Sequence, residues 1–145
     1  MRLLILHVDY FNCSVTERGR SKIIEDPPQK NIEVAEALLA LVSVEKQDET
    51  NPRNVSKKAI EELAEISQHL KVNTIVLHPF AHLFGKLSKP EVAVKTIKLI
   101  EEGLAQHGLK VTRTPFGWFN IIELRAKGHP LSRIARKISA HAQAD

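Results

Sequence analysis

The chain has 145 residues and a mass of 16.3 kDa, which accommodates one ordinary domain and excludes most multidomain enzyme architectures. Hydrophobic residues make up 43% of the sequence and charged residues 26%, as in globular proteins with a packed core. No apolar stretch approaches the roughly 20 residues that span a bilayer, and the single cysteine, Cys13, excludes an internal disulfide. We therefore expect a soluble, cytoplasmic protein that does not bind membranes.

Positive charge is concentrated near the C-terminal end of the sequence. Residues 1–108 contain 14 basic and 15 acidic side chains, whereas residues 109–145 contain 7 basic and 2 acidic ones. This asymmetry points to a polyanionic partner that docks near the last quarter of the chain. A solvated basic surface would give the same pattern, so charge by itself leaves both interpretations open.

The N-terminal part of the chain is predicted to contain two strands. Residues 1–7 form a continuous apolar run, which predicts a central strand that is buried on both faces. The alternation over residues 11–15 predicts a second strand, and turn-forming residues at 17–20 predict a hairpin from Leu3 to about Ile24. Residues 26–31 are polar and contain two prolines, so we expect a surface loop there.

A strand and a long helix are predicted next. Residues 36–45 are apolar and end in β-branched residues, which predicts a strand, although their alanines and leucines also suit a helix. Asn51 then provides an N-cap and Pro52 a first helical residue for a helix of about five turns. Its apolar face consists of Val55, Ala59, Leu63, Ile66 and Leu70. Residues 73–78 predict a further strand, which Pro79 ends.

The second long helix is predicted to begin at a capping box formed by Ser88 and Glu91 and to end at Gly108. Its apolar face consists of Ala93, Ile97, Ile100 and Leu104. Residues 109–112 and 118–125 predict two strands joined as a hairpin. A last set of apolar residues shares helical spacing and predicts a short C-terminal helix: Leu131, Ile134, Ala135 and Ile138. Strands that alternate with two long helices indicate an α/β domain on a mixed sheet.

Common catalytic motifs are absent from the sequence. It contains no glycine-rich nucleotide loop, no H-E-x-x-H and no G-x-S-x-G, which argues against nucleotide hydrolases, zincins and serine hydrolases. His78 and His82 follow a predicted strand, but Pro79 prevents one regular helix from carrying both. No cysteine or carboxylate lies at metal-motif spacing from them, so we expect no metal site.

Two aromatic corners that contain proline are candidate binding features, at residues 78–82 and 115–119. Proline and packed rings fix backbone amides and carbonyls in a geometry that suits recognition of a small ligand. Corners that only pack the core would have the same composition, so these residues do not decide between the two roles.

Five segments, in order and at matching spacing, resemble the N-terminal editing domain of archaeal-type threonyl-tRNA synthetases. They are LLILHVDYF, ALLALVSVEKQDETNP, HPFAHLFGKLSKPEVA, TPFGWFN and KGHPLS. The resemblance implies a D-aminoacyl-tRNA deacylase-like fold with a mixed, mostly antiparallel sheet, two long helices and a short C-terminal helix. We expect residues 1–138 to form this domain and residues 139–145 to be a tail or the start of a linker to further modules.

The resemblance also implies an activity and partners. It implies a dimeric aminoacyl-tRNA deacylase that hydrolyses L-serine mischarged on the threonine tRNA, with water positioned by backbone groups and assisted by a ribose hydroxyl of the tRNA. It implies no cofactor in this domain. ATP and zinc would belong to a synthetase module with threonine-tRNA ligase activity, and the partners in a longer chain would include such catalytic or anticodon-binding modules.

The family's site residues map onto ten positions of this sequence. The implied catalytic residues are His82 and Asn120. The implied substrate-binding residues are Pro79, Phe80, Ala81, Phe116, Phe119 and Arg133. The terminal adenosine of the tRNA would lie near Val44 and Glu45.

Three of these positions depart from the family pattern. Asn120 replaces a lysine, Arg133 replaces a glutamate expected in the last helix, and Phe119 replaces a tyrosine. Loss of a general base or an oxyanion partner costs orders of magnitude in rate, so the departures test whether those side chains are the catalysts. The alternatives are a catalytically decayed module that only binds the tRNA 3′ end and a free-standing D-aminoacyl-tRNA deacylase.

Overall fold

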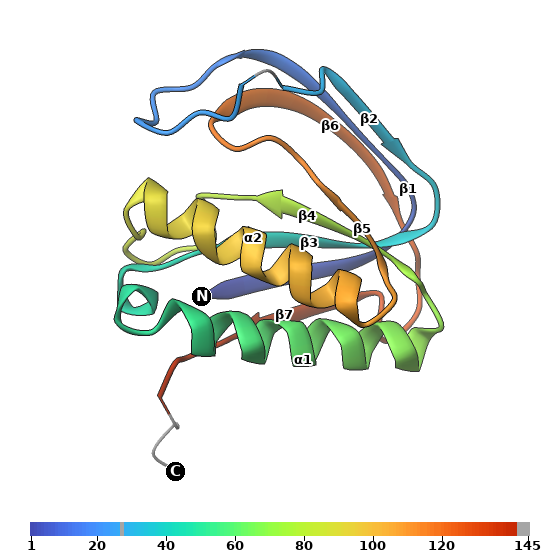
Figure 1. Ribbon diagram of the computed structural model, residues 1–145. Coiled ribbons are helices and arrows are strands. Elements are labelled where there is room, and N and C mark those ends of the chain that lie inside the picture. Colours follow the sequence, from blue (N-terminus) through green and yellow to red (C-terminus); the bar gives the residue numbers. More distant parts are fainter. Residues whose placement is uncertain (27, 142–145) are drawn as a thin grey trace.

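A computed structural model describes residues 1–26 and 28–141 of the protein. Pro27 of the predicted surface loop and residues 142–145 of the predicted tail lie outside the described residues. The described strands form one mixed sheet, and two helices cover one of its faces (Figure 1). Neither of these helices is both long and apolar enough to cross a membrane.

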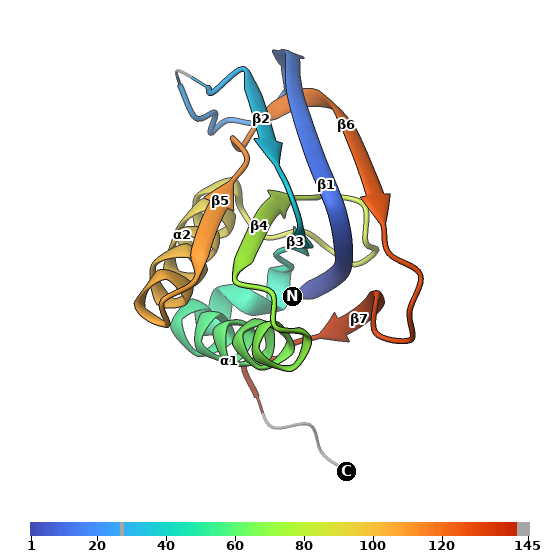
Figure 2. The ribbon, with the colours of Figure 1, turned by 90° about the vertical axis from the view of Figure 1, so that its right-hand side faces the viewer.

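The first strand, β1 (Arg2–Arg18), takes part in all the antiparallel pairings between strands. Its first half pairs with β3 (Ala37–Ser43) on one side and with β7 (Arg133–Lys137) on the other. Its second half pairs with β2 (Asn31–Val34) and β6 (Trp118–Ala126). The second half of β1, together with β2 and β6, rises beyond the layer of helices; we call these three segments the wing (Figure 2).

The predicted N-terminal hairpin is wrong, because the chain runs through the expected break as one strand. The polar residues Asp9 and Tyr10 lie beside a shift in the register between β1 and β6, and both side chains are exposed. A bulge of this kind bends a strand without ending it. Strand β2, which begins where the predicted surface loop ends, has no counterpart among the predicted elements.

Strand β3 is buried along its whole length, which confirms the strand predicted over residues 36–45. A short 3-10 helix, η1 (Lys46–Thr50), follows it. Strands β4 (Thr74–Pro79) and β5 (Lys110–Arg113) extend the sheet as parallel neighbours. Parallel strands need crossover connections, and α1 (Pro52–Leu70) and α2 (Pro90–Gln106) supply them.

The two helices begin differently. The Asn51 side chain caps α1 as predicted, because it accepts a 3.1 Å hydrogen bond from the Asn54 backbone nitrogen. The capping box predicted for α2 does not form: Lys89 is the N-cap, and the Ser88 hydroxyl donates to the Lys89 carbonyl oxygen at 3.1 Å. The apolar faces of both helices turn toward the sheet, as their spacing predicts.

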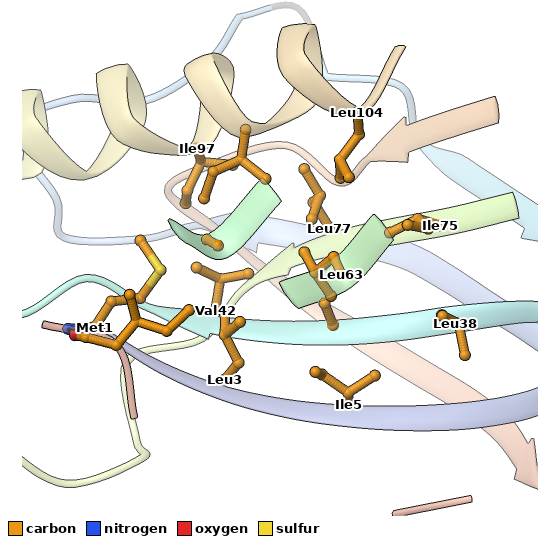
Figure 3. Close-up of a cluster of buried hydrophobic side chains, with 14 of the residues drawn as sticks. Met1, Leu3, Ile5, Leu38, Val42, Leu63, Ile75, Leu77, Ile97 and Leu104 are labelled. Carbon is orange, nitrogen blue, oxygen red and sulfur yellow. Dashed lines mark hydrogen bonds between the residues drawn. The ribbon is translucent and has the colours of Figure 1, made fainter. Parts of the chain in front are cut away.

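The main core lies between the helices and the sheet (Figure 3). The side chains of Leu3, Val42 and Leu77 from the sheet meet Leu63 of α1 and Ile97 of α2 in this layer. A second apolar cluster lies on the other face, under the wing. On β3 and β4 its residues have the opposite parity to those of the main core, and on β1 the register shift after Val8 brings Phe11 and Cys13 to this face. This cluster includes Val8, Phe11, Cys13, Leu39, Leu41 and Val76. The sheet is therefore covered on both faces at its centre.

Two predictions for the C-terminal part of the chain are wrong. Strands β5 and β6 do not form a hairpin, because β5 pairs with β4 and β6 pairs with β1. The predicted C-terminal helix is the strand β7. Ile134 of β7 is buried and its neighbours on both sides are exposed, which is the alternation of a strand. Ile134 and Ile138 are four residues apart, a spacing that fits the period of a strand as well as that of a helix. Pairing with β7 satisfies the backbone groups along the free side of β1.

The α/β class, the mixed sheet and the two long helices are confirmed. Four of the six pairings between described strands are antiparallel, as expected for a mostly antiparallel sheet. The likeness of this fold to D-aminoacyl-tRNA deacylases stays a prediction.

Candidate functional site

A cavity of about 550 Å³ opens where β3 and β4 end. Most of its walls come from four parts of the chain: the end of β3, residues 78–82, the first turns of α2 with Leu87 and Ser88 before them, and residues 115–122; Ser21 also lines it. The carboxyl ends of parallel strands are a common place for ligands to bind in α/β proteins. The two aromatic corners singled out in the sequence therefore face one shared space.

The first corner follows β4. Pro79 has no N–H group, so it cannot donate a backbone hydrogen bond to a neighbouring strand. The Phe80 backbone nitrogen instead donates to the Val42 carbonyl oxygen at 2.9 Å, which fixes the start of the corner. The rings of Phe80 and His82 meet edge to face, with centroids 5.4 Å apart. Ala81 and His82 are exposed beside the cavity, where a ligand can reach them.

The second corner is held by Glu25, a residue that the sequence analysis missed. Its carboxylate pairs with Arg113 and accepts a 2.9 Å hydrogen bond from the Phe116 backbone nitrogen. Its backbone carbonyl oxygen accepts a 2.6 Å bond from Trp118 Nε1. Gly117 has a φ of +89° and lies so close to this segment that a Cβ would meet a backbone oxygen at 2.8 Å. No sequence motif marks Glu25, because its partners lie about 90 residues away.

Eight of the ten predicted site residues line the cavity. They are Val44, Pro79, Phe80, Ala81, His82, Phe116, Phe119 and Asn120. Asn120 lies on the inner side of β6, and its side-chain amide donates to the Trp118 carbonyl oxygen at 3.3 Å. Phe119 alternates with it and is 54% exposed, so its ring lies at the outer side of the strand.

The other two predicted residues do not line the cavity. Glu45 is buried, and its carboxylate lies 3.2 Å from Arg2 Nε and 3.5 Å from the Met1 ammonium group. Arg133 is exposed on β7, opposite Leu6 of β1, and not in the helix that was predicted for it. Its assignment as a substrate-binding residue has no support in the geometry of this chain.

No Asp, Glu, Lys or Arg side chain lines the cavity within the described part of the chain. Two serines do line it, and their hydroxyls are used locally. Ser21 accepts from the Ile23 backbone nitrogen at 3.2 Å, and Ser88 donates to the Lys89 carbonyl oxygen. Neither contacts an imidazole, so the cavity has no activated serine nucleophile.

His78 is a polar lining residue that the sequence analysis considered as a metal ligand and as the first residue of the corner at 78–82, but not as a site residue of the family. Its side chain is 4% exposed, and its Nδ1 lies 2.8 Å from the Thr114 hydroxyl oxygen. The Phe11 ring packs against it edge to face, with centroids 5.9 Å apart. Burial lowers the pKa of His78 from 6.5 to about 4, because the charged imidazolium would lose its hydration. His78 is therefore neutral near pH 7.

Several charged groups of the C-terminal part are paired. Lys127 lies 2.6 Å from Asp9 and 3.1 Å from Glu36, and Arg136 pairs with Glu62. Within residues 1–26 and 28–141, no three His, Cys, Asp or Glu side chains gather as metal ligands do. The expectations of a polyanionic partner and of no cofactor in this domain both stay predictions.

Comparison with known proteins identifies the family. A family model described as the archaea-specific editing domain of threonyl-tRNA synthetase matches residues 1–138. The chain is 41% identical to the threonine–tRNA ligase of Methanocaldococcus jannaschii, over 97% of this chain and 22% of that protein. The ligase of Methanopyrus kandleri is also 41% identical, over 98% of this chain and 23% of that protein. The ligase of Thermococcus kodakarensis is 40% identical, over 95% of this chain and 22% of that protein.

The chain thus spans less than a quarter of the length of these relatives. The match to the family model nevertheless covers nearly the whole chain and includes all of the segments that form the cavity. The chain belongs to the family of archaea-specific editing domains of threonyl-tRNA synthetases.

Proposed function

We propose that this domain hydrolyses the ester bond between L-serine and the threonine tRNA and so corrects mischarging. The observation that carries the proposal is the composition of the cavity. Eight residues implied by the family resemblance line it, and no Asp, Glu, Lys or Arg side chain of the described chain does. Such a cavity suits a small, polar but uncharged group, such as the side chain of serine.

A second site is needed because serine and threonine differ by one methyl group. Serine fits any pocket that accepts threonine, and the lost methyl contact discriminates by only about 1–3 kcal/mol. An editing pocket can instead exclude threonine by a clash with its extra methyl. In this chain Ala81, at the turn between Phe80 and His82, is placed to form that wall.

The proposed reaction uses water as the nucleophile. A water oxygen attacks the ester carbonyl carbon, the bond to the ribose oxygen breaks, and that oxygen takes up a proton to leave a free tRNA end and serine. Backbone groups of the two corners, with His82 and Asn120, would orient the water and the ester, and a ribose hydroxyl of the tRNA would assist. Positioning of reactants in this way can supply several kcal/mol of rate enhancement without a charged base, ~7–11 in favourable cases.

Deacylation of charged tRNA by wild type and Ala81→Val tests this proposal. Wild type should hydrolyse seryl-tRNA, and the variant should be slower because two added methyl groups fill the cavity wall beside Phe80. Ala135→Val is the matched control, since Ala135 is exposed on β7 and does not line the cavity. Equal rates for Ala81→Val and the control would contradict the placement of the pocket, and no hydrolysis by wild type would contradict the activity.

A catalytically decayed module that only binds the tRNA 3′ end is the second candidate. It is favoured by Asn120, which replaces a lysine, and by the lack of charged side chains around the cavity. This candidate predicts that a non-hydrolysable seryl-adenosine analogue binds while seryl-tRNA survives. A free-standing D-aminoacyl-tRNA deacylase would instead prefer D-seryl over L-seryl esters, so one assay with both esters separates the three.

We also propose that the domain forms a homodimer. Phe119 and Ile121 are 54% and 58% exposed on the outer side of β6, which among the described strands pairs only with β1. Exposed apolar side chains next to an open strand edge favour association. Sedimentation should give a dimer for wild type and a smaller species for Ile121→Lys; a wild-type monomer at all concentrations would contradict the dimer.

The remaining proposals concern the longer protein. The reaction consumes only water, so ATP and zinc would belong to a synthetase module. Catalytic and anticodon-binding modules of a threonyl-tRNA synthetase, together with mischarged threonine tRNA, are the proposed partners. The proposed place of action is the cytoplasm, where tRNA is aminoacylated.

A further inference from the structure

His78 differs from every other polar residue around the cavity. It is the one polar lining side chain of the described chain that is more than nine-tenths buried, whereas His82 and Asn120 are accessible. A buried polar side chain normally has all of its hydrogen bonds satisfied. His78 has one satisfied ring nitrogen, Nδ1, and a second, Nε2, that no described residue contacts through a hydrogen bond.

The hydrogen bond with Thr114 determines which ring nitrogen of His78 carries the proton. The Thr114 backbone nitrogen donates to the Leu77 carbonyl oxygen at 3.0 Å, which fixes Thr114 beside β4. Thr114 is fully buried, and the His78 ring is the only described partner of its hydroxyl. Donation by the hydroxyl to Nδ1 gives its hydrogen its one described acceptor, and the neutral imidazole would then carry its own hydrogen on Nε2.

Nε2 retains some accessible surface. It has no described hydrogen-bond partner, yet it is not among the fully buried side-chain atoms without a partner, of which Ser43 Oγ is the only one in the described chain. His78 is a lining residue of the cavity, so a ligand bound there can reach this nitrogen. The rings of Phe11 and Phe80 lie beside the His78 ring, with centroids 5.9 and 6.5 Å from it, and give it apolar surroundings. A ligand that fills the cavity thus meets one fixed hydrogen-bond donor on an apolar wall.

We propose that His78 is a substrate-binding residue whose Nε2–H donates a hydrogen bond to the side-chain hydroxyl oxygen of the bound seryl group, with Thr114 holding the imidazole in the required tautomer. The inference rests on the proposed function of the site. The ribose and adenine of a tRNA end must stay near the mouth, where His82 and Ser88 are accessible, so the amino-acid side chain is the part that reaches the most buried donor.

Binding of two non-hydrolysable adenosine analogues tests the role of His78. One analogue carries a seryl group, and the other carries an alanyl group, which lacks the hydroxyl. His78→Phe leaves a ring in place but removes the donor, and we expect it to weaken binding of the seryl analogue about 5- to 100-fold. Binding of the alanyl analogue should change less than about twofold, because it makes no such bond. His78→Gln, which places an amide donor near the position of Nε2, should restore part of the seryl affinity.

Thr114 variants test how the tautomer is set. Thr114→Val removes the hydroxyl at nearly constant volume, and Thr114→Ser is the matched control that keeps it. The 15N signals of the His78 ring should report the Nε2–H tautomer in wild type and in Thr114→Ser, and a mixture in Thr114→Val. Thr114→Val should also weaken binding of the seryl analogue more than binding of the alanyl analogue. This variant keeps the proposal testable even if His78→Phe does not fold.

The outcomes separate this proposal from the proposed function. Suppose that wild type binds the seryl analogue and that His78→Phe either weakens binding of both analogues equally or leaves both unchanged. The assignment of His78 is then overturned, and the editing activity stands. If wild type binds neither analogue, both proposals fail. An Nδ1–H tautomer in wild type would also overturn the assignment, since Nε2 could then only accept a hydrogen bond.

Discussion

Replacement of His78 by phenylalanine should remove a pH-dependent part of the stability of the protein. The His78 pKa is about 4 in the folded protein and 6.5 in the unfolded chain, because burial disfavours the charged ring. Between these two pH values the His78 ring is protonated in the unfolded chain but neutral in the folded protein. The stability contributed by His78 is therefore complete above pH 6.5 and is lost progressively as the pH falls toward 4.

The two pKa values give the size of the effect. Between about pH 7.5 and about pH 5, the linkage relation predicts that His78 lowers the free energy of unfolding of wild type by about 2 kcal/mol. Carboxylates and other histidines also titrate in this range. They are common to wild type and His78→Phe, so the difference between the two proteins isolates His78.

Chemical denaturation at several pH values measures this difference. The free energy of unfolding of wild type should fall by about 2 kcal/mol more than that of His78→Phe over this range. Val76→Ala is the matched control, because Val76 is buried on the same strand and face but does not titrate. Val76→Ala should lower the free energy of unfolding by a similar amount at every pH. Parallel curves for wild type and His78→Phe would refute the reasoning and show that the ring is hydrated in the folded protein.

Three further predictions concern the corners of the cavity. His82→Ala should raise the KM for seryl-tRNA about 10-fold with little change in Tm, since His82 is exposed; unaltered kinetics would remove it from the site. Asn120→Lys should change the rate by less than about 10-fold if side chains only position the substrate, and a much larger gain would identify the lysine as a catalyst. Glu25→Ala should lower the free energy of unfolding by about 1–3 kcal/mol and slow deacylation, because the Phe116 amide loses its acceptor and Arg113 keeps only its pair with Glu101. Equal stability in denaturant would contradict this role.

The helices were the most predictable part of the fold, because their signals are local. The Asn51 cap, the proline after it and the apolar spacing of α1 all act within a few residues of one another. The same kind of spacing misled the prediction at Ile134 and Ile138, which are four apart and fit both a helix and a strand. What decides in favour of β7 is the open side of β1, more than 125 residues earlier in the chain.

The site was predictable where the family motifs define it and not where tertiary contacts do. The two corners were found because proline and aromatic residues mark them in the sequence. Glu25 was missed because its role depends on contacts with Arg113 and Phe116, far away in the sequence. His78 is the first residue of a recognised corner, but its burial and its bond to Thr114 emerge only when β4 and the segment after β5 lie side by side.

We propose that this domain removes serine, and not threonine, from the threonine tRNA. A side-by-side measurement of the hydrolysis rates of L-seryl-tRNA and L-threonyl-tRNA by the purified protein tests this directly. We expect rapid hydrolysis of L-seryl-tRNA. Hydrolysis of L-threonyl-tRNA should be slower by more than ~10- to 200-fold, the discrimination that one methyl group gives in a simple binding pocket. Equal rates for the two esters, or no loss of serine above the uncatalysed background, would contradict it.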